Sequence, residues 1–307
     1  MKAMSPLSKC SLGKRSLGSI VAFFALTLAP GFCWSTPFFF STGDPDGKMA
    51  TASRPGLGTF EIESADDFIL TSNTAITSAT FTGLIVPNPG ATPTITNVVV
   101  EIYRVFPKDS DVGRTSGSPP FSTPQVPARV NSPSDVEFDG RDASMPGELT
   151  FATTDLGSFS ASNSVQPGGI HPLPTGPTTG GDGSVTGEEV EFTVTFTIPF
   201  SLPADHYFFV PQVEVSAGDF LWLSAPKPIV PPGTPVPAGF TDLQSWTRDQ
   251  FLDPDWLRVG TDIVGGTPAP TFNAVFSLTG TAPEPGSLAL AGVALLAGWW
   301  YRRKRSR

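Results

Sequence analysis

Cysteine and histidine are nearly absent from this sequence. Its 307 residues include two cysteines, Cys10 and Cys33, and two histidines, His171 and His206. Both cysteines precede the predicted mature chain, which would therefore have no disulfide and no thiol nucleophile. No G-x-S-x-G elbow and no H-E-x-x-H motif occurs. Serine, cysteine and zinc hydrolases thus have no recognisable constellation here, and we expect the chain not to be an enzyme.

Charge is also scarce, and the basic residues crowd the two ends. Charged residues make up 15% of the chain. Residues 36–282 hold 10 Lys and Arg against 27 Asp and Glu, a net charge of −17. Such a surface repels a phosphate backbone, so we expect no nucleic-acid partner. The acidic balance suits cations, or solubility outside the cell.

Glycine, proline and phenylalanine are abundant instead. The chain has 31 Gly, 33 Pro and 24 Phe, a composition that favours strands and turns over helices. No long stretch between the ends shows helical periodicity. We therefore predict an all-β fold. The predicted strands are 58–62, 76–86, 97–106, 189–200, 207–215, 219–224 and 273–279.

The run 189–200 has the clearest strand pattern. One face is acidic or hydroxylated, from Glu191 to Thr197, and the other is apolar. The apolar face comprises Val190, Phe192, Val194, Phe196 and Ile198. This alternation is typical of a half-buried antiparallel strand with one face in water.

We expect these strands to form a single antiparallel β-sandwich or jelly-roll-like domain over residues 36–282. Long surface loops are expected at about 107–133 and 160–187. The segment Ala65-Asp66-Asp67-Phe68-Ile69-Leu70 and the later Val100-Glu101-Ile102-Tyr103 loosely resemble the opening of β-sandwich domains in secreted bacterial proteins. That resemblance supports the fold and implies no activity.

The N-terminus is typical of a secretory signal peptide. Four basic residues precede the apolar run 17–29, and small residues at 33 and 35 suit cleavage after Ser35. The run is short for a membrane span and Pro30 follows it directly. We therefore expect residues 1–35 to direct Sec export and to be removed by signal peptidase.

Three parts follow one another at the C-terminus. Pro283-Glu284-Pro285 precedes an apolar stretch, 286–301, that ends in two tryptophans and a tyrosine. At about 1.5 Å per residue, this stretch can span a slightly thinned bilayer as a helix. The basic residues that follow are Arg302, Arg303, Lys304, Arg305 and Arg307. They would fix this end in the cytoplasm and leave the body outside.

This tail resembles the PEP-CTERM sorting signal. The resemblance implies that Pro283, Glu284 and Pro285 are recognised by exosortase, a membrane-embedded cysteine protease that cuts near them. The precursor would then be anchored in the inner membrane before the protein is passed to the cell surface or the medium. An ordinary single-pass anchor, in which the prolines only stiffen the junction, is the alternative reading.

We expect no cofactor, and calcium is the one exception for which the sequence offers candidate ligands. Asp109 and Asp111 form one acidic turn, and Asp253 and Asp255 another. Carboxylate oxygens in such turns are ligands that calcium prefers. One run that begins at Asp135 resembles the first half of an EF-hand loop. It cannot be an EF-hand, because its twelfth position is Pro146, where a bidentate glutamate is required. Asx turns explain the four aspartates equally well.

Trp246 and Trp256 are candidates for an aromatic platform under sugar rings. Trp246 lies in a polar stretch and is the better candidate for exposure. The alternative is that both fill the core. Trp222 alternates with Leu221 and Leu223, so it should face the opposite way, towards a second core or towards solvent.

The sequence thus predicts an exported surface or matrix protein without enzymatic activity. By the resemblance of its tail, it would associate with exopolysaccharide in a biofilm, because exosortase systems are linked to exopolysaccharide production. The first alternative is a carbohydrate- or calcium-binding adhesion module. The second is a secreted glycoside hydrolase, which needs two converging carboxylates. The candidates for that pair are Asp66, Asp67, Glu188, Glu189 and Glu191.

Overall fold

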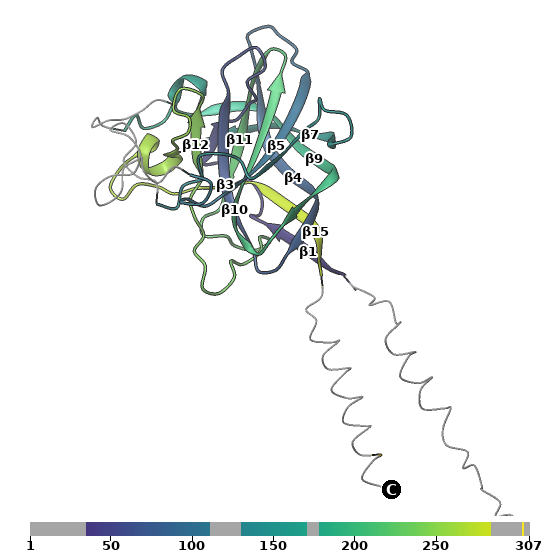
Figure 1. Ribbon diagram of the computed structural model, residues 1–307. Helices are drawn as coiled ribbons and strands as arrows, with labels where there is room; N and C mark the ends of the chain where they lie inside the picture. Colours follow the sequence, from purple (N-terminus) through teal and green to yellow (C-terminus); the bar gives the residue numbers. More distant parts are fainter. Residues whose placement is uncertain (1–34, 111–129, 171–177, 284–302, 304–307) are drawn as a thin grey trace, which may run out of the picture. The chain divides into compact units, whose positions relative to one another are not determined.

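The computed structural model describes residues 35–110, 130–170, 178–283 and 303 (Figure 1). The predicted signal peptide up to residue 34, the apolar stretch 286–301 and the basic tail other than Arg303 lie outside these residues. Among the residues described, no helix combines the length and the apolar character needed to cross a bilayer. We refer to residues 35–283 as the body.

The larger of two sheets has nine strands. Its central strand, β4, pairs with β9 on one edge. On its other edge it pairs with β15 along its first half and with β11 along its second. The strands of this sheet are β1 (Ser35–Ser41), β2 (Met49–Ala52), β4 (Thr74–Pro87), β7 (Leu149–Ala161), β8 (Asn163–Val165), β9 (Val185–Leu202), β11 (Gly218–Ala225), β14 (Asn273–Ala274) and β15 (Phe276–Pro283).

The second sheet has six strands in the order β13-β12-β3-β10-β5-β6. Its strands are β3 (Ile62–Leu70), β5 (Ile95–Arg104), β6 (Asp139–Asp142), β10 (Asp205–Val215), β12 (Trp246–Asp249) and β13 (Leu257–Arg258). All its neighbouring strands are antiparallel. In the larger sheet β2 and β8 are parallel, so the fold is mostly, not wholly, antiparallel.

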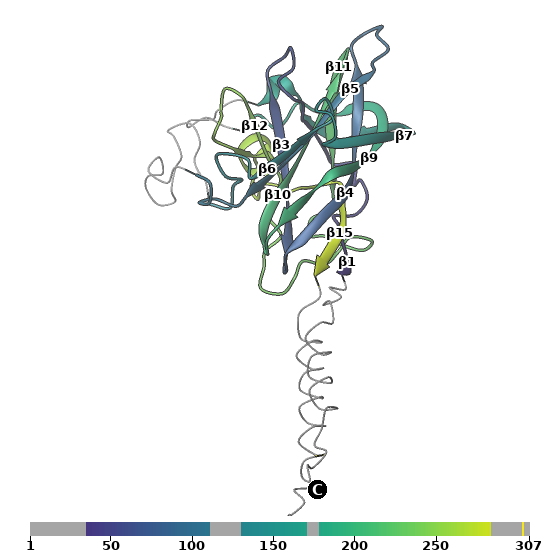
Figure 2. The ribbon, with the colours of Figure 1, turned by 45° about the vertical axis from the view of Figure 1, so that its right-hand side comes forward.

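The two sheets enclose one aromatic core, and Figure 2 shows them as packed layers. Phe81 and Phe192 of the larger sheet stack with ring centroids 4.8 Å apart. Phe209 of the smaller sheet stacks on Phe276 of the larger at 5.0 Å. Each fully buried phenylalanine stabilises the fold by about 1.5–3 kcal/mol, so these contacts hold the sheets face to face. The all-β prediction is confirmed.

Trp222 confirms that the larger sheet has a core on each face. Its side chain lies in the aromatic core, whereas Leu221 and Leu223 lie in a second apolar cluster with β2 and the segment 252–275. All three side chains are at most 2% exposed. The predicted alternation was correct, and burial on both sides resolves its two alternatives in favour of a second core.

Six of the seven predicted strands coincide with β-structure, and the first does not. Residues 58–61 belong to the turn before β3, and the strand runs on through Ile62–Leu70. The alternation rule misses β3 because all nine of its residues are buried, including polar ones. In β9, Ile198 was expected on the buried face but is 53% exposed. The β4–β9 register shifts near this point, which turns Ile198 outward.

The segment predicted as loop 160–187 contains regular structure. It includes the end of β7, the strand β8 and a 3-10 turn at Pro167–Gly169, and it ends inside β9. Residues 171–177 of this segment and residues 111–129 of the other predicted loop lie outside the described residues. A single π-helical turn, Val259–Val264, follows β13.

The edge strand β1 is guarded against further pairing. Ser41 exchanges hydrogen bonds with Thr234 on the side away from β15. By the two-residue period of a strand, Pro37 and Phe39 face the same open side. Proline has no N–H to offer there, which is a common way to protect a sheet edge.

Candidate functional site

The outer face of the six-stranded sheet holds a buried cluster of charged and aromatic side chains. We call residues 242–275, which include β12 and β13, the covering segment. Leu243, Trp246 and Trp256 from this segment pack against Ala65, Tyr103, Phe208 and Val210 of the sheet. This face, which would otherwise meet water, therefore forms a third and smaller apolar cluster.

Arg248 joins the covering segment to β3. Its Nη2 donates to Glu63 Oε1 at 3.0 Å, and its Nε donates to Glu63 Oε2, so the pair is bidentate. The Tyr103 hydroxyl donates to Glu63 Oε1 at 2.6 Å. Both charged side chains are nearly buried, at 5% and 6% exposure. Such a pair fixes the position of β12 beside β3, because breaking it would leave a buried charge unpaired.

Aromatic rings and a second acid complete the surroundings of Arg248. Its guanidinium carbon lies 4.3 Å from the centroid of the Trp256 ring. Its Nη1 donates to Asp253 Oδ1 at 2.9 Å. Trp256 in turn donates its indole N–H to the Ser134 carbonyl at 3.1 Å. The covering segment, β3 and residues 134–135 are thus held together at one guanidinium.

Two further carboxylates of β3 bind backbone N–H groups of the covering segment. Asp66 accepts from Ala274 N at 2.7 Å, and Asp67 accepts from Leu243 N at 2.9 Å. Asp67 also meets His206 Nε2 at 2.6 Å. Burial raises the pKa of Asp66 well above its usual range, and the neighbouring Asp67 charge raises it further. Burial likewise raises the pKa of Asp67, against the lowering effect of its bond to His206.

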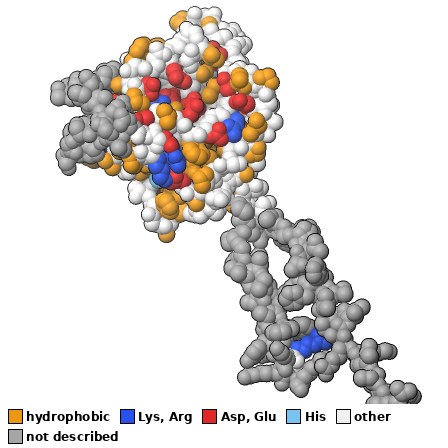
Figure 3. Space-filling view, viewed as in Figure 1, with side chains coloured by type: hydrophobic (Ala, Val, Ile, Leu, Met, Phe, Trp, Pro, Cys, Tyr) orange, Lys and Arg blue, Asp and Glu red, His pale blue; other side chains and the backbone are white. Residues whose placement is uncertain are grey.

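Glu101 is the carboxyl of this face whose charge is least compensated. Burial raises its pKa well above the usual range, and the negative charge of Glu63 adds to the effect. Gln212 donates to Glu101 Oε2 at 3.4 Å, while its own Oε1 has no partner among the described residues. Glu61 and Glu137 also raise the pKa of Glu101. Figure 3 shows acidic side chains gathered over β3, β5 and β10.

The structure contradicts the aromatic platform predicted at Trp246 and Trp256. Trp246 is 1% exposed and Trp256 is 2% exposed, so no shared sugar-binding face exists. The polar residues next to Trp246 are themselves buried, since Ser245 and every residue of β12 are buried, although Gln250 at the end of the stretch is exposed. The polar sequence around Trp246 wrongly indicated exposure, because the charged Arg248 in it is paired with Glu63 inside the protein.

The predicted calcium ligands are separated, and two of them bind arginine. Asp109 pairs with Arg104 through both carboxylate oxygens, and Asp253 pairs with Arg248. Asp255 is 4% exposed, and Asp111 lies outside the described residues. Within residues 35–110, 130–170 and 178–283, no three acidic, histidine or cysteine side chains gather as a metal site would require.

The arrangement on this face fastens the covering segment to β3. Glu63 and Glu101 both meet the Tyr103 hydroxyl, at 2.6 and 3.2 Å, as two converging carboxylates. The oxygens of Glu63, however, already accept from Arg248 and Tyr103 in a buried position. Sequence reasoning noticed Asp66 and Asp67 but missed Glu63 and Arg248. The only available signal was the run of acidic residues inside a strand that has apolar residues at both ends.

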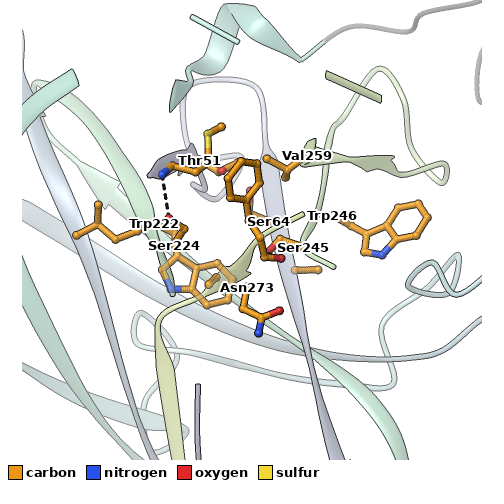
Figure 4. Close-up of a pocket in the computed structure, with 13 residues that line it drawn as sticks. Thr51, Ser64, Trp222, Ser224, Ser245, Trp246, Val259 and Asn273 are labelled. Carbon is orange, nitrogen blue, oxygen red and sulfur yellow. Dashed lines mark hydrogen bonds between the residues drawn. The ribbon is translucent and has the colours of Figure 1, made fainter. Parts of the chain in front are cut away.

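An internal cavity lies where the covering segment meets β2, β3 and β11 (Figure 4). Its volume is about 10 Å³, which is room for about one water molecule. Ser64, Ser245 and Asn273 supply polar atoms to its wall, and the Trp246 indole extends away from them. This cavity is too small for any organic ligand.

A wider surface groove of about 610 Å³ lies along the loop between β11 and β12. Its one cation, Lys227, donates to the carbonyls of Asp242 and Leu243 and to Asn273 Oδ1. Lys227 also pairs with the Asp242 carboxylate at 3.0 Å. The charged groups of this groove, Lys227 and Asp242, are therefore engaged with each other, and most of the remaining wall is apolar.

Both ends of the body meet at one end of the larger sheet. Strands β1 and β15 are antiparallel, and Ser35 pairs with Pro283. Ser35 is the residue after which signal-peptide cleavage is predicted, and Pro283 begins the Pro-Glu-Pro sequence. Glu284 and Pro285 lie outside the described residues. No linker residues separate the last strand from the predicted recognition sequence.

Comparison with protein families identifies a PEP-CTERM protein-sorting motif at residues 281–305. The match begins within β15 and covers the Pro-Glu-Pro sequence, the apolar stretch and most of the basic tail. The predicted resemblance of the C-terminus is confirmed. No curated protein and no solved structure matches the chain.

Proposed function

We propose that this chain, which carries a PEP-CTERM protein-sorting motif, is an exported, non-enzymatic protein that exosortase delivers to the cell surface or the surrounding matrix, where it associates with exopolysaccharide. The observation that carries the proposal is the motif at residues 281–305, attached directly to the last strand of the body. Export and inner-membrane anchoring of the precursor follow from the motif.

The body supports a binding or scaffolding role more than a catalytic one. Its most perturbed carboxylates are Asp66 and Asp67 on β3, which bind the covering segment, and Glu101 on β5, which meets Tyr103 and Gln212. Perturbed carboxylates are a common mark of active sites, but buried structural networks produce the same effect. Here the partners are backbone N–H groups, a histidine, a tyrosine and a glutamine, so the buried network accounts for the perturbed pKa values.

Mass spectrometry of the native protein tests the sorting step. We expect a mature species that begins near Thr36 and ends between Pro283 and Pro285, found in the envelope and medium only when the sorting protease is present. The variant Glu284→Ala should retain its tail, and Glu191→Ala, on the solvent side of β9, should be processed normally. An intact tail in both strains would contradict sorting and would support a plain membrane anchor.

Co-sedimentation tests the association with polysaccharide. The processed protein from culture fluid should sediment with the polysaccharide purified from the same cells and stay in the supernatant without it. If the processed protein stays in the supernatant with and without the polysaccharide, the proposed association with polysaccharide is wrong, while the sorting by exosortase is unaffected.

A further inference from the structure

We infer that a pocket at the end of the body opposite Ser35 and Pro283 binds one uncharged sugar ring of a polysaccharide. The inference rests on the proposed association with exopolysaccharide and assigns it a site. We call it the distal pocket; its walls come from the turn between β2 and β3 and from the β10–β11 hairpin. Its main lining residues are Arg54, Leu57, Thr59, Glu214, Ser216 and Asp219.

The position of the distal pocket follows from the strand register. β4 runs along the larger sheet with Ala75 beside Thr281 of β15 and with Pro87 beside Gly218 of β11. Its 14 residues span about 45 Å at the usual rise per residue. The β10–β11 hairpin therefore lies far from the paired ends β1 and β15 (Figures 1 and 2). A body held by its C-terminal end would present this pocket outward.

The polar groups of the distal pocket suit vicinal hydroxyls. Arg54 Nη1 donates to Asp219 Oδ1 at 2.7 Å, and the two side chains remain 16% and 33% exposed. Arg54 Nε donates to the Phe60 carbonyl at 3.1 Å, while its Nη2 has no partner among the described residues. A planar fork of donors beside a carboxylate can donate to one sugar hydroxyl and accept from the next.

An aromatic pair adjoins the polar groups. The Arg54 guanidinium lies 4.6 Å from the centroid of the Phe60 ring. Phe60 contacts Phe251 with ring centroids 5.8 Å apart. Phe251 is 74% exposed, the most exposed of the large apolar side chains, and Leu57 is 50% exposed. Leu57 lines the distal pocket, and the Phe60–Phe251 pair lies outside its lining but adjoins it through Arg54. Together they offer a surface for the C–H face of a sugar ring at the rim of the pocket.

Charge and size restrict the ligand. The pocket has one arginine and two carboxylates, Glu214 and Asp219, within a body of strongly negative net charge. A uronate would be repelled, so the ring is uncharged. The volume of about 190 Å³ is below the ~300–1,000 Å³ of pockets for larger ligands, so it suits one ring rather than an oligosaccharide. In the groove at Lys227, by contrast, the polar groups are already engaged.

Saturation-transfer NMR on the processed protein tests the site, with glucose, galactose, mannose, N-acetylglucosamine and glucuronate as probes. We expect at least one uncharged sugar to bind and glucuronate not to bind. Phe251→Ala should raise the dissociation constant about two- to tenfold. Phe39→Ala, which truncates a ring of 59% exposure on β1 at the other end, should leave it unchanged. Arg54→Lys, which keeps the charge but loses the planar fork, should weaken binding similarly.

Thermal unfolding of each variant separates lost binding from lost folding. The proposal is overturned if no uncharged sugar binds, if glucuronate binds as well as the others, or if folded Phe251→Ala and Arg54→Lys bind like the wild type. Co-sedimentation keeps the two proposals apart. If the native polysaccharide retains folded Phe251→Ala as tightly as the wild type, the distal pocket is wrong and the association stands.

Discussion

At the scale of single residues, Arg248 concentrates more interactions than any other side chain described on the outer face of the small sheet. Its guanidinium meets Glu63, Asp253, the Tyr103 hydroxyl and the Trp256 ring. The partners come from β3, β5 and the covering segment itself. One side chain therefore connects three parts of the chain that are far apart in sequence.

We expect Arg248→Ala to lower the free energy of unfolding by about 3–5 kcal/mol, because it leaves Glu63 buried without its counter-charge. Urea denaturation followed by tryptophan fluorescence measures this loss. Lys48→Ala, which removes the exposed Lys48 ammonium from its pair with Asp46, should stay within about 1 kcal/mol of the wild type. A similar small loss for Arg248→Ala would show that the buried pair does not hold the covering segment.

Glu101 should make stability depend on pH in the direction opposite to ordinary surface acids. Its pKa is raised in the fold, so the folded chain keeps a proton that the unfolded chain releases above pH ~4.3. The free energy of unfolding should therefore fall as pH rises from that value through the raised pKa. Glu101→Gln removes this ionisation.

Relative to the wild type, Glu101→Gln should gain stability between pH 5 and pH 8, because the variant has no carboxyl to ionise in this buried position. Urea denaturation at a series of pH values gives the two curves. Glu191→Gln, remote from this cluster on β9, should run parallel to the wild type. A parallel curve for Glu101→Gln as well would refute the role of Glu101.

Trp246 shows what a sequence cannot settle at this scale. Its neighbours, from Asp242 to Gln250, are polar, which indicates exposure. Whether such residues face water depends on partners far along the chain, here Glu63, which is 185 positions away from Arg248. The residues around Trp246 in the sequence do not indicate that a distant strand supplies a counter-charge to Arg248.

At the scale of elements, the strands with clear alternation were predicted well, and the fully buried strand β3 was not. Apolar and polar residues alternate in β9 and β5 because one side of each strand faces the aromatic core and the other does not. The bounds of both strands lie within a few residues of the prediction. β3 is buried on both faces, and its carboxylates hold the covering segment. The polar residues that stabilise β3 are the ones that concealed it.

The edge strand β1 gives a prediction at this scale. Pro37 faces the open side of β1, beside the exposed Phe39. Pro37→Val restores an N–H on that side and raises the strand propensity, so we expect concentration-dependent association. Light scattering during size-exclusion chromatography measures it. Thr36→Val, which faces β15, is the matched control and should stay monomeric at the same concentrations.

At the scale of the whole molecule, the C-terminal sorting signal could be read from the sequence, while the arrangement of the body could not. The C-terminal signal is encoded locally, in a run of 25 matched residues. The sheet contacts join residues that are often more than 100 positions apart, such as Ser35 and Pro283. Such pairings follow from packing the whole chain, which is why the distal pocket had no sequence signature.

The net charge of the body predicts which polymers it should avoid. With a charge of −17 over residues 36–282, the processed protein should not bind alginate or DNA at low or physiological salt. Affinity electrophoresis at about 20 and 150 mM salt, the latter with a Debye length of about 8 Å, tests this. Retardation that weakens as salt rises would reveal a basic surface that the charge balance does not suggest.

The pairing of Ser35 with Pro283 has a consequence for the life of the protein after processing. A cut after Ser35 and a cut near Pro283 would leave no trailing peptide at either end, because both new ends lie within paired strands. Exopeptidases need a loose end to thread into their active sites, and the medium around a microbial community contains many of them. The same two cuts that would release this protein would therefore leave exopeptidases no unpaired chain end at which to begin.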